Sequence, residues 1–245
     1  MTNLNKLVRN TDSLLKFRLS IYFLAFAHLV IMSIRLLLVK DFENSEDETI
    51  RVYAKSKWKL ITTWFNLLSF GYIPVCIYCD LRELKENGTK HLKMFMGIRD
   101  FLFTSFVLPT TAFADILFWR LWYHDRELMF PQSVDNVIYY WEQHSLHTLS
   151  LVFVIFDLLF VRRERPKSMV PGIIAMLGFI SLYIAVCVHS VANEEYLYPV
   201  LKKFSPSKLL VLTIYTLTSV LFYHTGQWLV IDFINGHQRR LKKNV

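Results

Sequence analysis

Long apolar stretches alternate with short charged segments along the whole chain. A bilayer core about 30 Å thick requires roughly 20 apolar residues in helical conformation to cross it. Six stretches meet or approach this length: residues 19–39, 60–79, 101–119, 144–161, 168–192 and 209–231. They lack the alternation of apolar and polar residues that is typical of membrane β-strands. The pattern therefore predicts an all-α fold, a polytopic integral membrane protein with six transmembrane helices.

The composition agrees with a membrane fold. Hydrophobic residues make up 53% of the 245 residues and aromatic residues 16%, which would leave a soluble domain too few polar residues to cover its surface. No linker, repeat or low-complexity segment divides the sequence, so we expect residues 1–245 to form a single domain. Cys76, Cys79 and Cys187 lie in predicted spans and are expected to pack there, because their spacing suits neither a disulfide framework nor zinc.

The distribution of Lys and Arg indicates the orientation in the membrane. Sixteen of these residues lie in the two tails and in the second and fourth connections, against ten in the other three connections. Because cytosolic segments carry the excess of basic residues, we expect both termini in the cytosol. The net charge of +8 then reflects topology and contact with anionic lipid, and no motif indicates a nucleic-acid partner.

Two short motifs bear on localisation. The glycosylation sequon at residues 87–89 falls in a cytosolic connection of this topology, where we expect it to stay without a glycan. Residues 242–245 resemble a di-lysine signal for retrieval to the endoplasmic reticulum. We therefore expect a multi-pass protein of the endoplasmic reticulum membrane, the plasma membrane or both.

Four polar residues fall at one shallow depth of the predicted bundle. Thr62, Asp115, His147 and His189 each lie three to five residues from the charged end of a span, roughly 4.5–7.5 Å at the helical rise. All four belong to the non-cytosolic ends of their helices, and His144 lies one turn from His147 on the same helix face. Because polar groups at membrane depth are costly and commonly functional, this layer is the best candidate for a site.

Thr62 and His147 have the chemistry for acyl transfer, which needs at minimum a hydroxyl and an imidazole within reach of one another. The imidazole takes the hydroxyl proton and returns it to the leaving alcohol, and a third group normally orients the ring. Asp115 or His189 can fill that third role. Asp115 can instead pair with Arg120, about one turn away on the same helix.

The polar residues also have interpretations without catalysis. A threonine in a membrane helix usually bonds its own backbone, and an intramembrane histidine more often joins helices than performs chemistry. We expect Asp157 and His224, nearer the cytosolic ends, to be packing contacts of this kind. His144, His147 and His189 can also ligate haem or a metal, although a transmembrane cytochrome would be expected to place paired histidines at fixed spacing across helices rather than on one side.

Short motifs occur in a specific order between residues 58 and 199. They are Trp58-Lys59-Leu60-Ile61-Thr62, Asp80-Leu81, Arg99-Asp100, Pro109, Phe118-Trp119, Asp125-Arg126-Glu127, Pro131, Asp135-Asn136, His144-Ser145-Leu146-His147-Thr148, His189 and Tyr198-Pro199. In these motifs the chain resembles the androgen-induced gene family, small six-helix membrane proteins that hydrolyse fatty acid esters of hydroxy fatty acids. The segment before Trp58 is longer and more acidic than is typical of that family, and Asp115 matches no family position.

The resemblance implies roles for these residues. Thr62, two apolar residues after Trp-Lys, would be the nucleophile, and His147, the second histidine of the His-x-x-His pair, would be the base. The implied substrate is a fatty acid ester of a hydroxy fatty acid taken from the bilayer, with no cofactor or metal and no protein partner named. Lys59 and Arg126 lie near the level where its carboxylate would need a cation. The oxyanion donor stays open between Thr63 and a backbone amide.

Three other functions remain open. An acyltransferase would use the same acyl-enzyme and differ only in the acceptor. A non-enzymatic membrane regulator or scaffold would use the polar layer for packing alone. A haem-binding redox protein would use the histidines as ligands.

Overall fold

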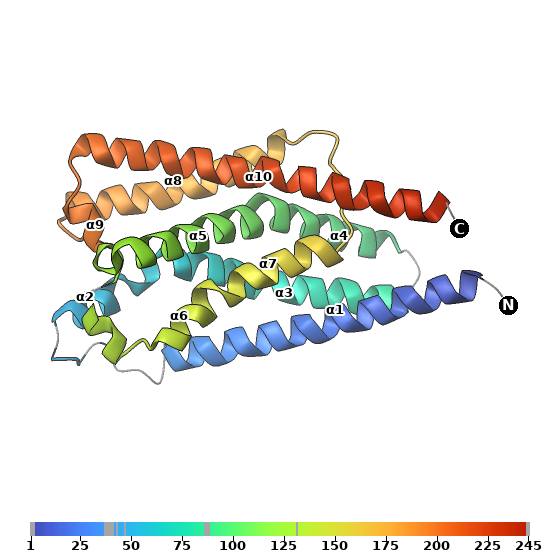
Figure 1. Ribbon diagram of the computed structural model, residues 1–245, viewed down its shortest axis with the longest axis horizontal. Helices are drawn as coiled ribbons and strands as arrows, with labels where there is room; N and C mark the ends of the chain where they lie inside the picture. The colour runs from blue at the N-terminus through green and yellow to red at the C-terminus, as the bar shows by residue number, and fades with distance from the viewer. Residues whose placement is uncertain are drawn as a thin grey trace.

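The computed structural model is an all-helical bundle. It describes residues 3–36, 42, 44–46, 48–85, 89–130 and 132–243. Six helices in this part of the chain are long and apolar enough to cross a membrane, which confirms the predicted fold class. The first helix begins, and the last one ends, at the same end of the bundle (Figure 1). Residues 37–39 of the first predicted span, 87–88 of the sequon and the last two of the di-lysine motif lie outside the described residues.

The spans differ in how many helices build them. Four are single helices: α1 (Asn3–Ile34), α3 (Ile61–Lys85), α8 (Val170–Ala192) and α10 (Pro206–Lys243). The third span joins α4 (Lys90–Leu102), the π-helical turn η3 (Phe103–Val107) and α5 (Leu108–Asp125), and the fourth joins α6 (Tyr140–His147) and α7 (Leu149–Phe160). Short elements cover the end of the bundle opposite the termini: α2 (Glu48–Ser56), α9 (Pro199–Lys202), η2 (Lys57–Lys59), η4 (Arg126–Leu128) and η5 (Gln132–Asn136).

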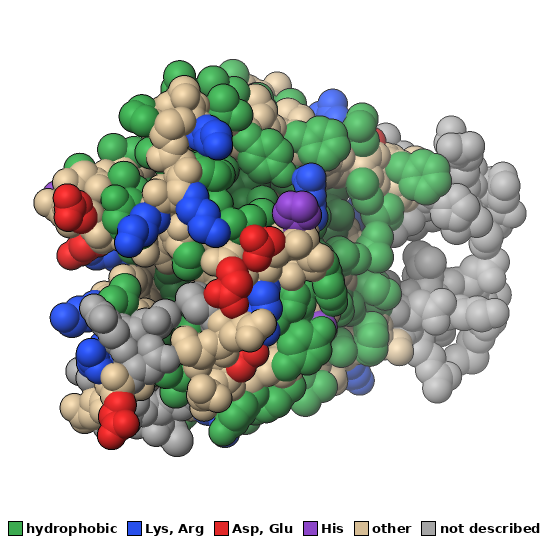
Figure 2. Space-filling model, turned by 60° about the vertical axis from the view of Figure 1, so that its left-hand side comes forward, with side chains coloured by type: hydrophobic (Ala, Val, Ile, Leu, Met, Phe, Trp, Pro, Cys, Tyr) green, Lys and Arg blue, Asp and Glu red, His purple; other side chains and the backbone are tan. Residues whose placement is uncertain are grey.

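The outer surface of the bundle suits a membrane. Large hydrophobic side chains are exposed along several spans, among them Leu24, Leu67, Ile174, Leu182, Phe222 and Leu229. Figure 2 shows Lys, Arg, Asp and Glu side chains gathered on the end formed by the short elements, beside flanks on which hydrophobic side chains dominate. Because soluble proteins seldom expose so much contiguous apolar surface, these flanks are the lipid-facing surface.

Four spans begin earlier in the chain than the apolar pattern predicts, and in two of them the difference exceeds one helical turn by several residues. The first begins at Asp12 and the third at Lys90, whereas residues 19 and 101 were expected. Arg18 of α1 donates to the Asp80 carboxylate of α3 over 2.9 Å, and Arg99 of α4 lies 3.8 Å from the same carboxylate. Because charges that are paired inside a bundle are tolerated there, neither arginine ends its helix.

The π-turn η3 results from a proline and is stabilised by α10. In a π-turn each carbonyl accepts from the amide five residues later, and for Thr104 that residue is Pro109, which has no N–H. His224 Nδ1 and Gln227 Nε2 donate to the Thr104 carbonyl instead, over 2.8 and 2.7 Å. A side chain at Gly172 would meet the His224 ring at 3.2 Å, so the glycine lets α8 pack against this junction.

A buried carboxylate joins the helices at the end of the bundle near the termini. Asp157 of α7 accepts hydrogen bonds from Tyr22 of α1, at 2.9 Å, and from Tyr72 of α3, at 3.0 Å. Arg163 forms a salt bridge with it, and both side chains are fully buried. Because the pair is inaccessible to water, its charges are compensated only inside the protein, where Asp100 also lies 3.5 Å from the Arg163 guanidinium.

Replacing Asp157 with Asn is expected to destabilise the bundle by about 3 kcal/mol or more, since it removes the closer of the two carboxylates that pair with the buried Arg163 and leaves only that of Asp100, at 3.5 Å. Asp232→Asn is the matched control, because Asp232 pairs with Arg165 at 2.8 Å with both side chains about half exposed. That change should cost about 1 kcal/mol or less. Thermal unfolding in detergent micelles measures both, and equal losses for the two variants would contradict the assigned role of Asp157.

Candidate active site

The start of α3 fixes the position of Thr62. Leu60 is extended, with φ −76° and ψ 141°, and its carbonyl accepts the amide hydrogens three and four residues later. The helix therefore begins at Ile61, whose amide donates to the Tyr198 hydroxyl over 3.2 Å. Burial raises the pKa of Tyr198 to about 12, so this hydroxyl stays neutral. Tyr198, one of the motif residues, thus anchors the first turn of α3 from the connection that precedes α9.

The two neighbouring threonines of α3 differ in their hydrogen bonds. The Thr63 hydroxyl donates to the Lys57 carbonyl over 2.5 Å. The Thr62 hydroxyl has no hydrogen-bond partner among the described residues, because α3 begins at Ile61 and Thr62 therefore has no carbonyl of its own helix four residues earlier to receive it. The hydroxyl of Thr62 is therefore available to a ligand, whereas that of Thr63 is engaged.

A buried carboxylate fixes the ring of His147. Nδ1 of His147 lies 3.0 Å from Oδ1 of Asp115, which is fully buried on α5. Ser150 donates to the other carboxylate oxygen over 2.5 Å. A carboxylate accepts hydrogen bonds, so Nδ1 carries the proton and Nε2 is left as the acceptor. This arrangement is the one in which an imidazole is ready to take a proton from a hydroxyl.

Aromatic side chains hold the His147 ring in place. Phe118 stacks on it with ring centroids 3.6 Å apart and planes inclined by 7°, and Phe65 meets it edge-on at 6.2 Å. Trp119 donates its indole N–H to the His147 carbonyl over 3.2 Å. The stacked Phe118 ring and the hydrogen bond between Nδ1 and Asp115 leave the imidazole little freedom to rotate, which favours one orientation before a ligand binds.

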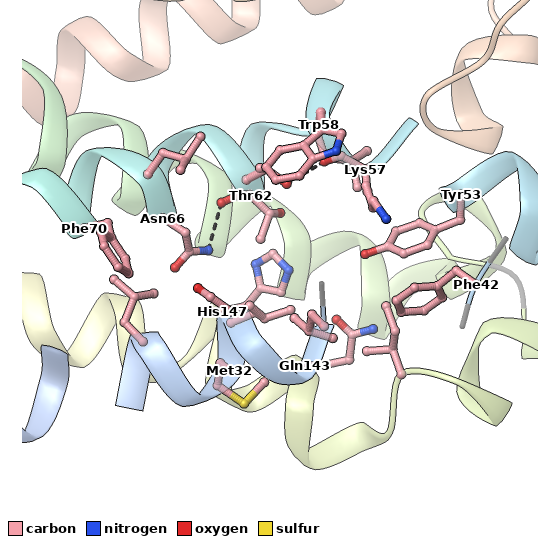
Figure 3. A pocket seen from close by; sticks show the side chains of 18 of the residues that line it. Met32, Phe42, Tyr53, Lys57, Trp58, Thr62, Asn66, Phe70, Gln143 and His147 are labelled. Atoms are coloured by element: carbon pink, nitrogen blue, oxygen red, sulfur yellow. Dashed lines mark hydrogen bonds between the residues drawn. The ribbon is translucent and has the colours of Figure 1, made fainter. Parts of the chain in front are cut away.

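Thr62 and His147 line one cavity. It has a volume of about 110 Å³ and lies between α1, α3 and α6, with Phe42, Tyr53 and Phe130 at its outer end. Figure 3 shows the Thr62 side chain and the His147 ring facing the same space from opposite helices, with Asn66 one turn further along α3. Most of the lining is apolar, so the hydroxyl and the imidazole share a site suited to an apolar ligand.

The start of α6 is fixed by an ion pair with α1. Glu142 is fully buried, accepts the Tyr139 amide over 2.7 Å and pairs with Arg35 at 2.5 Å. A carboxylate in the first turn also interacts favourably with the helix dipole. Because His147 follows Glu142 by five residues on α6, the ion pair with Arg35 fixes the position of His147 along the bundle axis relative to α1. It thereby also fixes where the cavity ends on its outer side.

The other predicted site residues lie outside the cavity lining. His144 stacks on Trp119 and its Nδ1 lies 3.0 Å from the Thr148 hydroxyl. His189 is exposed at the end of α8, 3.2 Å from the Asn193 amide, so it does not orient His147. The three histidines considered as metal ligands therefore do not converge.

The expected cations for a substrate carboxylate are paired elsewhere. Lys59 bonds Glu195 at 2.5 Å, and Arg126 forms a two-point pair with Asp135 at 2.6 and 2.7 Å. Lys57 lines the outer part of the cavity, with its ammonium 5.9 Å from the centroid of the Phe42 ring. The sequence predicted Lys59 and not Lys57 for this role, because residues two apart lie on different faces of a turn and the sequence does not say which face lines a cavity.

Asn66 and Ser150 lie at the site although the sequence did not predict them there. Asn66 donates to the Thr62 carbonyl over 2.8 Å and lines the cavity. Its spacing of four residues from Thr62, which puts both on one helix face, is a signal that could have found it. Ser150 bonds Asp115, as above, and only the folded chain brings them together. Asp115 itself pairs with His147 rather than with Arg120, which donates to the Tyr215 hydroxyl.

Comparison with known proteins gives a consistent assignment. The chain is 28% identical over 174 residues to androgen-induced gene 1 protein of Homo sapiens, covering 68% of this chain and 72% of that protein. It is 29% identical over 167 residues to androgen-dependent TFPI-regulating protein of Mesocricetus auratus, covering 66% and 71%. No solved structure matches. The model of the family described as FAR-17a/AIG1-like protein matches residues 22–230, which include Thr62 and His147. The chain therefore belongs to this family, as its motifs predicted.

Proposed function

We propose that this protein is a membrane hydrolase that cleaves the ester bond of fatty acid esters of hydroxy fatty acids. The observation that carries the proposal is the unengaged Thr62 hydroxyl facing, across an apolar cavity, a histidine whose other nitrogen is held by a buried carboxylate. A hydroxyl, an imidazole and an orienting carboxylate are the three parts of a nucleophilic acyl-transfer site. The ester class follows from the family resemblance, and an apolar site open to lipid is consistent with it.

The reaction proceeds in two halves. The Thr62 oxygen attacks the acyl carbonyl while Nε2 of His147 takes the hydroxyl proton. As the tetrahedral intermediate collapses, the carbon–oxygen bond to the hydroxy fatty acid breaks and His147 returns the proton to the departing alkoxide. Water then attacks the acyl-threonine, giving one proton to His147. Collapse of the second intermediate releases the fatty acid and restores the Thr62 hydroxyl with that proton.

Asp115 acts as a positioning residue. Its bond to Nδ1 keeps Nε2 free of hydrogen in the resting state and stabilises the imidazolium that forms during each half of the reaction. The Ser150 hydroxyl, which bonds the second oxygen of this carboxylate, holds it in the required orientation. Burial of the carboxylate strengthens its interaction with the charged ring, because no water competes for it.

Two donors near Thr62 are suited to stabilising the oxyanion. The Thr62 backbone amide makes no hydrogen bond to any residue in the described part of the chain, and a nucleophile's own amide is a common oxyanion donor. The Asn66 side-chain amide uses one hydrogen for the Thr62 carbonyl and retains a second. Thr63 is the weaker candidate, because its hydroxyl is bonded to the Lys57 carbonyl. Preorganised donors of this kind are commonly the largest single contribution to catalysis.

The free carboxylate of the substrate belongs at the outer end of the cavity. A carboxylate is costly at membrane depth and favours the interface. Lys57 lines the cavity there, next to Trp58 and Tyr53 (Figure 3). A lysine on a flexible stem can meet a carboxylate at the interface while its methylene groups stay in the apolar wall.

Replacing Thr62 with Ala is expected to abolish ester hydrolysis, lowering kcat on the order of 10⁴-fold or more, because the nucleophile is lost. Labelling by a fluorophosphonate probe, which phosphonylates activated hydroxyls, should disappear with it. Thr63→Ala is the matched control and should retain both, since that hydroxyl is bonded to the backbone. Full hydrolysis by Thr62→Ala and an unlabelled wild-type protein would overturn the proposal and favour a regulator or scaffold without chemistry.

Asp115→Asn is expected to lower kcat strongly while leaving KM and membrane insertion little changed. An amide in this position favours the wrong histidine tautomer, which in a serine protease triad costs on the order of 10⁴-fold. Ser150→Ala keeps the carboxylate and should lose much less. Initial rates on one ester substrate at several concentrations separate kcat from KM, and an Asp115→Asn protein with unchanged kcat would contradict the positioning role.

A further inference from the structure

A groove between α1, α3 and α7 continues from the Thr62 cavity toward the other end of the bundle. Its volume is about 490 Å³. Leu29 and Asn66 line both the groove and the cavity, so the two spaces are adjacent and share a wall. The groove therefore begins one helical turn from the Thr62 hydroxyl.

One face of α3 forms the floor of this path. Thr62 lines the cavity, Asn66 lines both spaces, and Ser69 and Ile73 line the groove. Their spacings of four, three and four residues place them in a single stripe along the helix. From Thr62 to Ile73 the stripe is roughly 16 Å long at the helical rise, which suits an extended alkyl chain.

The walls of the groove open sideways toward lipid. Leu24 of α1 and Leu149 and Val152 of α7 line it and are exposed on the outer surface. Ala25 is the middle one of the five α1 residues that line the groove, and its side chain is short. A lipid in the bilayer can therefore enter laterally without passing through water.

A second cavity has different access. It measures about 230 Å³ and lies between α5, α8 and α10, lined among others by Ile61, Tyr198 and Val188. Ile61 and Tyr198 stand between it and Thr62, and they are joined by a hydrogen bond. This cavity serves as the control, because its lining is also mostly apolar but the first turn of α3 separates it from Thr62.

We infer that the groove binds the acyl chain that becomes attached to Thr62, an inference that rests on the proposed function. The substrate has two limbs, and only the hydroxy fatty acid limb carries a free carboxylate. That limb is directed to the outer end, because a carboxylate in the hydrocarbon layer is strongly disfavoured. The uncharged acyl limb follows the floor of α3 past Asn66 and Ser69 to Ile73. The groove thereby sets which acyl lengths fit.

Cysteine protection tests where the chain lies. Val152→Cys places a thiol in the groove and Val188→Cys one in the second cavity, and both valines are similarly exposed, 54% and 59%. Each variant is phosphonylated with a long-chain or a short-chain alkyl fluorophosphonate and then treated with a membrane-permeant maleimide. We expect the long-chain reagent to slow modification of Val152→Cys at least tenfold, the short-chain reagent to have no effect, and Val188→Cys to react equally throughout.

The outcomes separate the two proposals. If Thr62→Ala abolishes phosphonylation but Val152→Cys is not protected, the proposed role of the groove is wrong and the proposed hydrolase activity stands. Protection of Val188→Cys instead assigns the chain to the second cavity and also overturns it. Absence of any labelling at Thr62 overturns the proposed function and the groove with it.

Chain-length preference gives a second measurement. Ala25→Phe adds a ring to the middle of the groove and should lower kcat/KM for a long-chain acyl ester at least tenfold relative to a short-chain one, a range typical of pocket obstruction. Val188→Phe should leave the ratio unchanged. The short-chain fluorophosphonate reports an intact site in both variants, and an unaltered ratio in a labelled Ala25→Phe protein overturns the inference.

Discussion

A carboxylate at membrane depth has to find its partner inside the protein, because lipid offers none. Asp157 meets this requirement with Arg163 and with tyrosines from α1 and α3. The helices that this carboxylate joins, α1, α3 and α7, are the ones that form the groove. The separation of these helices is thus set by a polar contact at one end, and the space between them is what a lipid would occupy.

Asp115 is subject to the same constraint at the other end of the bundle, with a different result. It is as completely buried as Asp157, but its partner is a histidine, whose charge depends on protonation. In the proposed reaction the ring gains a second proton when the Thr62 hydroxyl gives up its own, and the charge of the ring then compensates that of the carboxylate. A permanent cation in this position would stabilise the fold and perform no chemistry. The partner therefore distinguishes the structural carboxylate of Asp157 from that of Asp115, which is placed to act in the proposed reaction.

The sequence predicts the number of spans and the depth of the site, because hydropathy and distance along a helix are local quantities. It predicts neither which face of a helix a residue occupies nor which helices are neighbours. His189 and His147 have the same expected depth, yet only His147 faces the cavity. Arg18 and Arg99 were expected to lie outside the spans, because their pairing with Asp80 depends on three helices packing together. The choice of Thr62 over Thr63 came from the motif, and the hydrogen bond that engages the Thr63 hydroxyl supports the same proposal.

The π-turn at Thr104 has a consequence for a residue well beyond it. A π-turn holds one residue more than the corresponding α-helical turn, and each residue rotates the following helix by about 100°. Asp115 lies downstream of η3, so its direction toward α6 includes that extra rotation. With a regular helix through the same stretch, the carboxylate would face a different neighbour and the His147 ring would lose its partner. Pro109 is not one of the proposed catalytic residues, yet through the π-turn it determines the rotation of α5 and hence the direction of the Asp115 carboxylate.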